Sequence, residues 1–363
     1  MATGERNSVR PETRRGRGTA SNDAGRFEAL RRAPLDDGWS ELDGELAPLK
    51  TTVEIDSSRS IVARNDSPDI PFDRSINPYR GCEHGCVYCY ARPSHAYLGL
   101  STGLDFETRL FMKPEAAVLL RAELAKPGYR PAVMALGSNT DPYQPIEKRW
   151  QVTRQILEVL AECDHPVGIT TKAALVTRDI DLLAAMAKKR LAKVYLSVTT
   201  LDRALARRME PRASTPERRL DAIAALAEAG IPTGIMTAPL IPGLNDHELE
   251  ALLEAAAERG AIEAGYTFIR LPHEIKDLFR DWLAEHYPNR SARVIHHIQQ
   301  ARGGRDNDPE FFSRMHADGP YARLISKRFR LACKRLGLNA AHYDFDTSLF
   351  KAPRPSSSQL TLI

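Results

Sequence analysis

Six short apolar segments alternate with helical patterns along the middle of the chain, and this alternation constrains the fold more than any other feature. The segments are nearly continuous in apolar residues, which is typical of strands buried on both faces of a parallel sheet. The Ala-rich helical stretch Pro216–Ala229 ends at Gly230, a residue favoured just beyond a helix. The predicted strands are Arg74–Tyr79, Pro131–Gly137, Val167–Lys172, Lys193–Thr199, Ile231–Leu240 and Gly265–Leu271.

These six strand–helix units predict an α/β fold, a partial (β/α)6 barrel of the TIM type rather than a closed barrel of eight strands. In such folds the functional groups gather at the carboxyl ends of the strands. Polar residues that end or follow the predicted strands, such as Ser138, Lys172 and Ser197, are therefore expected to share one site.

The two ends of the chain differ from this middle part in composition. RRGRG at Arg14–Gly18 and the low periodicity around it are typical of a disordered basic arm. Between Arg290 and Arg335, eleven Lys and Arg residues stand against four Asp and Glu residues, which predicts a basic helical extension. The expected division is a disordered arm over 1–50, the barrel over 51–290, the basic extension over 291–350 and a flexible tail over 351–363.

Charge and hydropathy restrict the partners. The chain has a formal net charge of +4, but the positive charge gathers at its ends, and this indicates an anionic partner such as nucleic acid. A solvated surface that keeps the protein soluble explains the same charges equally well. No apolar run is long enough to span a bilayer, and the N-terminus lacks the apolar segment of a secretory signal. We therefore expect a cytoplasmic protein without a membrane partner.

Three of the five cysteines fall within eight residues, in the segment NPYRGCEHGCVYCYARP. Their spacing is Cys82-x3-Cys86-x2-Cys89, which suits a metal or cluster site in a reducing compartment better than a disulfide framework. Thiolates are soft ligands for iron–sulfur clusters, zinc and copper. Three thiolates around a cubane leave one iron open to a small molecule, which favours catalysis over electron storage. Gly81 and Gly85 let the backbone fold tightly around the inorganic core.

A structural zinc site is the alternative interpretation of these cysteines. His84, His95 or Cys163 would then supply the fourth ligand. Structural zinc sites usually show a second pair of ligands downstream, but Cys163 and Cys333 are isolated. The spacing therefore favours the cluster.

The CxxxCxxC motif with an aromatic residue before the last cysteine resembles the radical S-adenosylmethionine (radical SAM) superfamily. The longer form GCEHGCVYCYAR resembles the DNA repair photolyase-like group, which is related to spore photoproduct lyase, and the likeness covers about residues 70–290. It implies a 4Fe–4S cluster held by Cys82, Cys86 and Cys89, with S-adenosylmethionine on the open iron. One electron from a flavodoxin or ferredoxin type of donor would cleave that ligand to a 5′-deoxyadenosyl radical.

The resemblance also implies which side chains contact S-adenosylmethionine. By the group that each would contact, they are Tyr88, Ala238 and Pro239 at the adenine, Tyr90 beside the same ligand, Ser138, Asn139 and Asp141 at the methionyl amino group, Lys172 at the methionyl carboxylate, and Ser197 at the ribose or the carboxylate.

The residues themselves agree with these roles, because a zwitterionic ligand needs a cation, polar acceptors and an apolar wall on one face. Lys172 is the only lysine at the carboxyl end of a predicted strand. Other interpretations stay open. Lys172 can be a surface lysine, Ser138 and Asp141 can be turn residues before Pro142, and Tyr90 can be a core aromatic residue.

The substrate is less constrained than the initiating chemistry. The related lesion-repair enzymes use a cysteine as hydrogen donor at the end of the strand that here reads MALGSNTD, and no cysteine lies between Cys89 and Cys163. Lesion reversal with that donor is therefore not expected. Three functions stay open: a radical SAM enzyme acting on nucleic acid, an activase or maturase acting on a protein or small molecule, and a non-catalytic zinc- or cluster-bearing binding module.

Two further segments bear on the partners. QLTLI at Gln359–Ile363 resembles the pentapeptide with which bacterial repair proteins bind the sliding clamp, and a Ser-rich tether precedes it; chance or a packed terminus is the alternative. Ala301–Phe312, with Gly303 and Gly304 flanked by arginines, is interpreted as a connection rather than a phosphate-binding loop.

Overall fold

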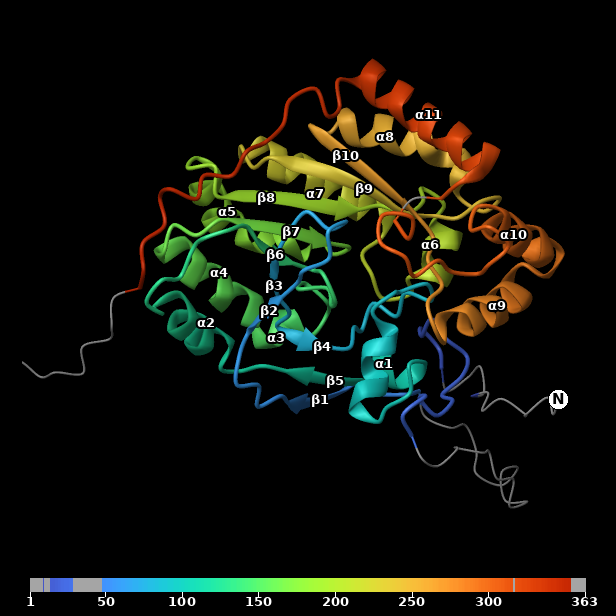
Figure 1. Cartoon of the computed structure of the whole chain (residues 1–363), viewed down its shortest axis with the longest axis horizontal. Helices are drawn as coiled ribbons and strands as arrows, with labels where there is room; N and C mark the ends of the chain where they lie inside the picture. Colours follow the sequence, from blue (N-terminus) through green and yellow to red (C-terminus); the bar gives the residue numbers. More distant parts are fainter. Residues whose placement is uncertain (1–8, 10–13, 29–47, 316, 354–363) are drawn as a thin grey trace, which may run out of the picture.

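The computed structural model describes residues 9, 14–28, 48–315 and 317–353. A seven-stranded sheet in the order β10-β9-β8-β7-β6-β3-β2 forms its centre (Figure 1). Six strands pair in parallel, and only β2 is antiparallel to its neighbour β3. The strands are β2 Val62–Arg64, β3 Arg74–Ile76, β6 Met134–Leu136, β7 Val167–Thr171, β8 Ala192–Ser197, β9 Thr233–Leu240 and β10 Glu263–Phe268.

The parallel α/β class predicted from the six apolar segments is confirmed. Within the described residues β10 and β2 form free edges, so the sheet does not close into a full barrel. One strand assignment is wrong. Arg74–Tyr79 is not a single strand, because the backbone leaves the sheet after β3 and enters a second sheet at Tyr79.

The helices between the strands pack on the outer face of the sheet. Their apolar residues meet those of the strands in one core, in which Ile169, Leu196 and Ile235 are almost completely buried. The sequence sets their limits locally; in α7, for example, the Thr215 hydroxyl accepts from the amide of Arg218 and Pro216 occupies the first turn. The helices are α2 Ala116–Leu124, α3 Glu147–Trp150, α4 Val152–Glu162, α5 Ile180–Ala187, α7 Pro216–Glu228 and α8 Leu249–Ala257, with the 3-10 turns η2 Ala174–Asp179 and η3 Asp246–Glu248.

A small second sheet, in the order β1-β5-β4, lies beside the first and was not predicted (Figure 1). Its strands are β1 Thr52–Ile55, β4 Tyr79–Arg80 and β5 Arg109–Met112. Gly81 and Cys82 follow β4 directly, so this sheet fixes where the cysteine segment begins. The 3-10 helix η1 Arg92–Leu98 and helix α1 Leu104–Thr108 follow that segment.

The C-terminal part is helical, as its composition predicts. Helix α9 (Ile275–His286) packs on α10 (Pro288–Gln300), and α11 (Gly319–Leu336) packs on α8. The expected boundary at residue 290 falls inside α10, because α10 buries Val294, Ile295 and Ile298 in the same apolar cluster as α9. None of the described helices is long and apolar enough to cross a membrane.

The prediction of a disordered arm over residues 1–50 is wrong for residues 14–28. Arg17, Thr19 and Ser21 are buried there. The amide of Leu104 donates to the carbonyl of Ser21 over 3.1 Å. Composition did not reveal this packing because each partner lies far away in the sequence. Gln359–Ile363, the predicted clamp motif, lies outside the described residues.

Candidate active site

The segment Cys82–Cys89 lies between β4 and η1 and turns all three thiols into the protein. Cys82 and Cys86 are each 7% exposed, and Cys89 is partly buried. Burial raises the pKa of all three thiols. Cys86 and Cys89 raise the pKa of Cys82 further, and Cys89 does the same to Cys86, because the three thiols lie close together. This arrangement keeps the thiols protonated unless a metal centre binds them as thiolates.

Two glycines allow the tight path of this segment. Gly81 and Gly85 have φ angles of 74° and 67°. A Cβ atom at Gly81 would lie 2.9 Å from the carbonyl oxygen of Phe106, and one at Gly85 would lie 2.6 Å from Oε2 of Glu107. Both positions therefore require glycine, as the sequence indicated.

A buried ion pair that the sequence did not reveal supports the segment Cys82–Cys89, which is called here the cysteine loop. Nε of Arg92 donates to the carbonyl of Cys86 over 2.8 Å, and its Nη2 lies 2.6 Å from Oε1 of Glu107. Neither side chain is exposed to solvent. Glu107 also accepts from the amides of Gly18 and Thr19 over 2.8 and 3.1 Å. The N-terminal segment is thereby joined to the back of the cysteine loop.

Four of the predicted ligand-contacting residues come together at the carboxyl ends of β7, β8 and β9. Nζ of Lys172 donates to Oγ of Ser197 over 2.6 Å, and that hydroxyl lies 3.3 Å from the carbonyl of Ala238. The same Nζ lies 5.8 Å from the ring centre of Tyr88. A cation, a hydroxyl and an aromatic wall thus converge next to the cysteine loop.

Glu210 is a further member of this cluster that sequence reasoning missed. It accepts from Tyr88 and from Arg219, and also from Oγ1 of Thr199 over 2.6 Å. It lies 3.9 Å from Nζ of Lys172. Burial alone would raise the pKa of Glu210, but Arg219 and Lys172 lower it to about 2. An ionised, fully buried carboxylate therefore anchors the ring of Tyr88. Its only signal in the sequence is its place after the helix that follows a predicted strand.

Asp141 lies near the cysteines, but its carboxylate is used within the protein. Oδ1 accepts from Oγ1 of Thr171 over 2.6 Å, and Oδ2 accepts from the amide of Lys172 over 2.7 Å. Nδ1 of His84 lies 3.4 Å from Oδ2. Burial would raise the pKa of Asp141, yet His84 and these donors lower it to about 2. Asp141 therefore ties the cysteine loop to the end of β7.

The remaining predicted residues lie on the rim of this site. The amide of Asn139 and Oγ of Ser138 both lie within hydrogen-bond distance of Oδ1 of Asn77, at 3.0 and 3.4 Å. The hydroxyl of Tyr90 donates to the carbonyl of Ser138, and the Tyr90 side chain is 53% exposed. Tyr90 is consequently not a core residue, which removes one alternative for it.

Among the described residues, no three His, Cys, Asp or Glu side chains are placed to hold a single metal ion. A cubane offers a separate iron to each of three thiols, so its ligands do not have to meet at one point. The donor set of three thiols, the glycine turns and the Lys172–Ser197 pair beside them fit a 4Fe–4S cluster with S-adenosylmethionine on its open iron.

Comparison with known proteins agrees with this fit. Residues 76–256 match the family model described as the radical SAM superfamily. An uncharacterized protein of Mycobacterium bovis is 38% identical over 226 residues, which are 62% of this chain and 66% of that protein. A radical SAM Nα-GlyT isomerase of Pseudomonas phage M6 is 28% identical over 201 residues, or 53% of this chain and 40% of the isomerase.

Solved structures show the same fold. A cysteine-to-serine mutant of spore photoproduct lyase superposes with a TM-score of 0.57 at 16% identity, covering 86% of this chain and 87% of the lyase. Another mutant of that lyase, with bound AdoMet and dinucleoside spore photoproduct, superposes with a TM-score of 0.52 at 15% identity. The superposition covers 79% of this chain and 80% of the lyase chain. The cysteine motif, the fold and the matched residues together define a radical SAM protein. The chain belongs to the radical SAM superfamily, whose members use a 4Fe–4S cluster and S-adenosylmethionine.

Proposed function

We propose that this chain is an enzyme that cleaves S-adenosylmethionine reductively and uses the resulting radical on a nucleic acid. The observation that carries the first part is the convergence of Cys82, Cys86 and Cys89 beside the Lys172–Ser197 pair. Cys82, Cys86 and Cys89 would hold the cluster, which in its reduced form would supply one electron to the sulfonium. Cleavage of the C5′–S bond would leave methionine and a 5′-deoxyadenosyl radical able to take a hydrogen atom from the substrate.

The chain's own residues bind and orient S-adenosylmethionine. Lys172 presents its ammonium group to the methionyl carboxylate, and Ser197, whose hydroxyl already accepts from Lys172, completes that contact. Glu210 holds the hydroxyl of Tyr88, so the ring stands as a fixed wall for the adenine. Ser138, Asn139 and the carbonyl of Ala238 supply polar groups on the rim. Asp141 acts through His84 and Lys172 as a positioning residue.

The proposed nucleic-acid substrate is supported by a cluster of arginines at the end of β10. Arg302 donates to the carbonyl of Ile269 over 3.2 Å and holds the connection between α10 and α11 against the end of that strand. Burial and the nearby Arg314 lower the pKa of Arg270, while Tyr90 and Asp69 act in the opposite direction. Within the described residues, the buried Nε of Arg270 has no hydrogen-bond partner. An anion such as a phosphate would satisfy it.

Two aromatic residues stand beside these arginines. Phe311 and Phe312 are 52% and 59% exposed, and the guanidinium of Arg314 lies 4.8 Å from the ring centre of Phe311. Arg314 is paired with Asp69 over 2.6 Å, which fixes this connection to the loop between β2 and β3. Exposed rings next to cations are typical of surfaces that stack bases and contact phosphates. The lyase complex to which the fold is similar holds a dinucleoside, and this agrees with the proposed substrate class.

The test is anaerobic reconstitution with iron and sulfide, followed by incubation with S-adenosylmethionine and dithionite. Formation of 5′-deoxyadenosine, together with absorbance near 400 nm, is expected for the wild type and absent from Cys86→Ala. Cys333→Ala is the matched control, because Cys333 is also buried but lies in α11 and should retain the activity. A colourless protein with stoichiometric zinc, or product formation by Cys86→Ala, would refute the proposal.

The substrate is tested separately by mass spectrometry of DNA, RNA and lysate fractions after the same reaction. Modification of a nucleic acid, with hydrogen taken from it into 5′-deoxyadenosine, is the expected result. Modification of a protein or small molecule instead would favour an activase or maturase.

All five cysteines are free thiols, which is consistent with the reducing cytoplasmic compartment that we propose.

A further inference from the structure

Helix α6 (Arg203–Met209) lies directly against the cysteine loop, on another side from Glu107 and the N-terminal segment. The amide of Val87 donates to the carbonyl of Met209 over 3.0 Å, and the amide of Arg212 donates to the carbonyl of His84 over 3.3 Å. Leu205 and Met209 pack in one apolar cluster with Cys86, Val87 and Tyr88. The outer surface of α6 is therefore separated from a cluster ligand by little more than the helix itself.

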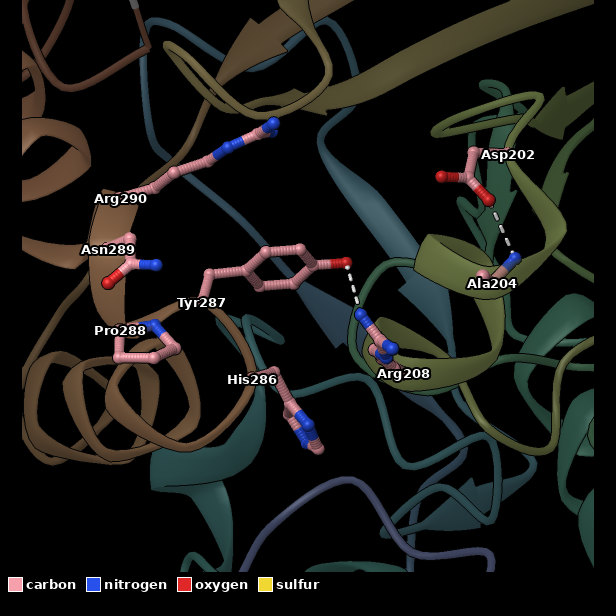
Figure 2. Close-up of a pocket in the computed structure, with 8 residues that line it drawn as sticks. All are labelled: Asp202, Ala204, Arg208, His286, Tyr287, Pro288, Asn289 and Arg290. Atoms are coloured by element: carbon pink, nitrogen blue, oxygen red, sulfur yellow. Dashed lines mark hydrogen bonds between the residues drawn. The ribbon is translucent and has the colours of Figure 1, made fainter.

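That outer surface is rich in arginine. Arg203, Arg207 and Arg208 are exposed on α6, and Arg290 is exposed at the start of α10. Figure 2 shows Arg208 and Arg290 on opposite sides of a hollow of about 360 Å³. The residues that line the hollow are Asp202, Ala204, Arg208, His286, Tyr287, Pro288, Asn289 and Arg290.

The acidic residues of this surface are already engaged. Asp202 caps α6 by accepting from the amides of Ala204 and Leu205 over 2.7 and 3.2 Å, as Figure 2 shows for Ala204. Glu217 lies 3.6 Å from Arg203, and Glu285 is paired with Arg14 over 2.7 Å. Among the described residues, Arg207 and Arg290 make no ion pair. The face defined by α6 and the start of α10, called here the α6 face, thus carries excess positive charge.

We propose that the α6 face is the docking surface for an acidic protein that delivers single electrons to the cluster. This inference rests on the proposed function, since only a cluster-bearing chain needs such a donor. The donor's reduced flavin or iron–sulfur centre would lose one electron and the cluster would gain it, with no bond made or broken. Electron transfer slows steeply with distance, so the donor must approach the cluster closely.

Position distinguishes this partner from a nucleic acid, the other anionic candidate. Lys172 and Ser197, which are proposed to bind S-adenosylmethionine, lie at the strand ends. Helix α6 instead contacts the cysteine loop, through the hydrogen bond between Val87 and Met209. A substrate bound on the α6 face would be separated from the radical by the loop and its ligands. A donor bound there has to reach only the cluster. Opposite charges on the two surfaces would speed their encounter, and salt would weaken it.

The test compares two reductants in the anaerobic assay for 5′-deoxyadenosine. The probe is an acidic flavodoxin reduced photochemically, and the reference is dithionite, which is small and needs no docking surface. The variant is the double charge reversal Arg207→Glu/Arg290→Glu. The control is Arg330→Glu, since Arg330 is exposed on α11, which packs on α8 instead of on the cysteine loop.

The quantity to measure is the ratio of the flavodoxin-driven rate to the dithionite-driven rate at low salt. We expect the double variant to lower this ratio on the order of tenfold, and raised ionic strength to lower it in the wild type as well. An unchanged ratio, or an equal loss in Arg330→Glu, would overturn the proposal. So would a variant that loses oligonucleotide binding while its ratio stays unchanged. Wild-type protein that forms no product with dithionite would instead refute the proposed function.

Discussion

Gly18 provides a sharp test of how the N-terminal segment supports the cysteine loop. A Cβ atom at Gly18 would lie 1.7 Å from the carbonyl oxygen of Gly85, and neither the new atom nor this backbone oxygen can rotate away. In Gly18→Ala the segment must therefore separate from the loop. The amides of Gly18 and Thr19 and the Thr19 hydroxyl would then lose their bonds to Glu107.

The cost can be bounded from these contacts. A hydrogen bond to a charged group contributes about 1.5–3 kcal/mol, so three of them give an upper limit of several kcal/mol. The freed residues recover conformational entropy of about 1–2 kcal/mol each, which offsets part of the loss. We expect the free energy of unfolding to fall by about 2–4 kcal/mol. Urea denaturation of anaerobic, cluster-loaded protein measures it, and trypsin should cut faster after Arg17.

Gly16→Ala is the matched control. Gly16 has a φ angle of 76°, but no atom lies within 4 Å of the position that a Cβ atom would take there, so this change introduces only backbone strain. The strain costs about 1–2 kcal/mol and should leave the cluster's absorbance and its resistance to air unchanged. If Gly18→Ala matches the wild type in stability and in protease resistance, the segment does not dock on the loop and the reasoning is wrong.

Three further predictions concern separate parts of the chain. Lys172→Met should weaken S-adenosylmethionine binding by about tenfold to a hundredfold, measured by calorimetry, because it removes one charge-assisted hydrogen bond; unchanged affinity would contradict the role of Lys172. Glu210 has a pKa of about 2 in the folded chain against an ordinary value of 4.5, so it contributes stability above pH 4.5 that is lost as the pH falls towards 2. Glu210→Gln should abolish that loss and, by leaving Arg219 unpaired, should cost about 3–5 kcal/mol at neutral pH in denaturant titrations; an unchanged acid profile would be contrary to this. Removal of Gln359–Ile363 should abolish binding to the bacterial sliding clamp in a pull-down. Binding that persists would show that these residues are not the clamp-binding motif.

The parts of the fold that were predictable are those with a local signal. The buried strands show as apolar runs, and the helix after Thr215 shows its cap and its terminal glycine. The proximity of Lys172 to Ser197 also followed from the sequence, because the carboxyl ends of neighbouring parallel strands meet at one edge. Such features can be predicted from the residues of one segment, or from the rule that neighbouring parallel strands end at the same edge of a sheet.

The features that were missed are held by partners distant in sequence. Glu107 binds residues 18 and 19, which are separated from it by 89 and 88 positions. Composition describes the N-terminal segment alone, and alone it cannot bury enough apolar surface to fold. The role of Glu210 was missed for the same reason, because its hydrogen-bond partner Tyr88 is 122 residues away in the sequence. The order of charges along the chain shows neither pairing.

The supports of the cysteine loop also restrict how a substrate can reach it. Glu107 and the segment around Gly18 cover one side, and Met209 of α6 covers another through Val87. The strand ends with Lys172 form the third side, where S-adenosylmethionine is proposed to lie. Tyr90 follows the ligand Cys89 directly and yet remains 53% exposed. Under the proposed function we therefore expect a substrate to approach past Tyr90, whose charge interaction with Arg270 places the two residues near each other. An electron donor on the α6 face would leave this approach open.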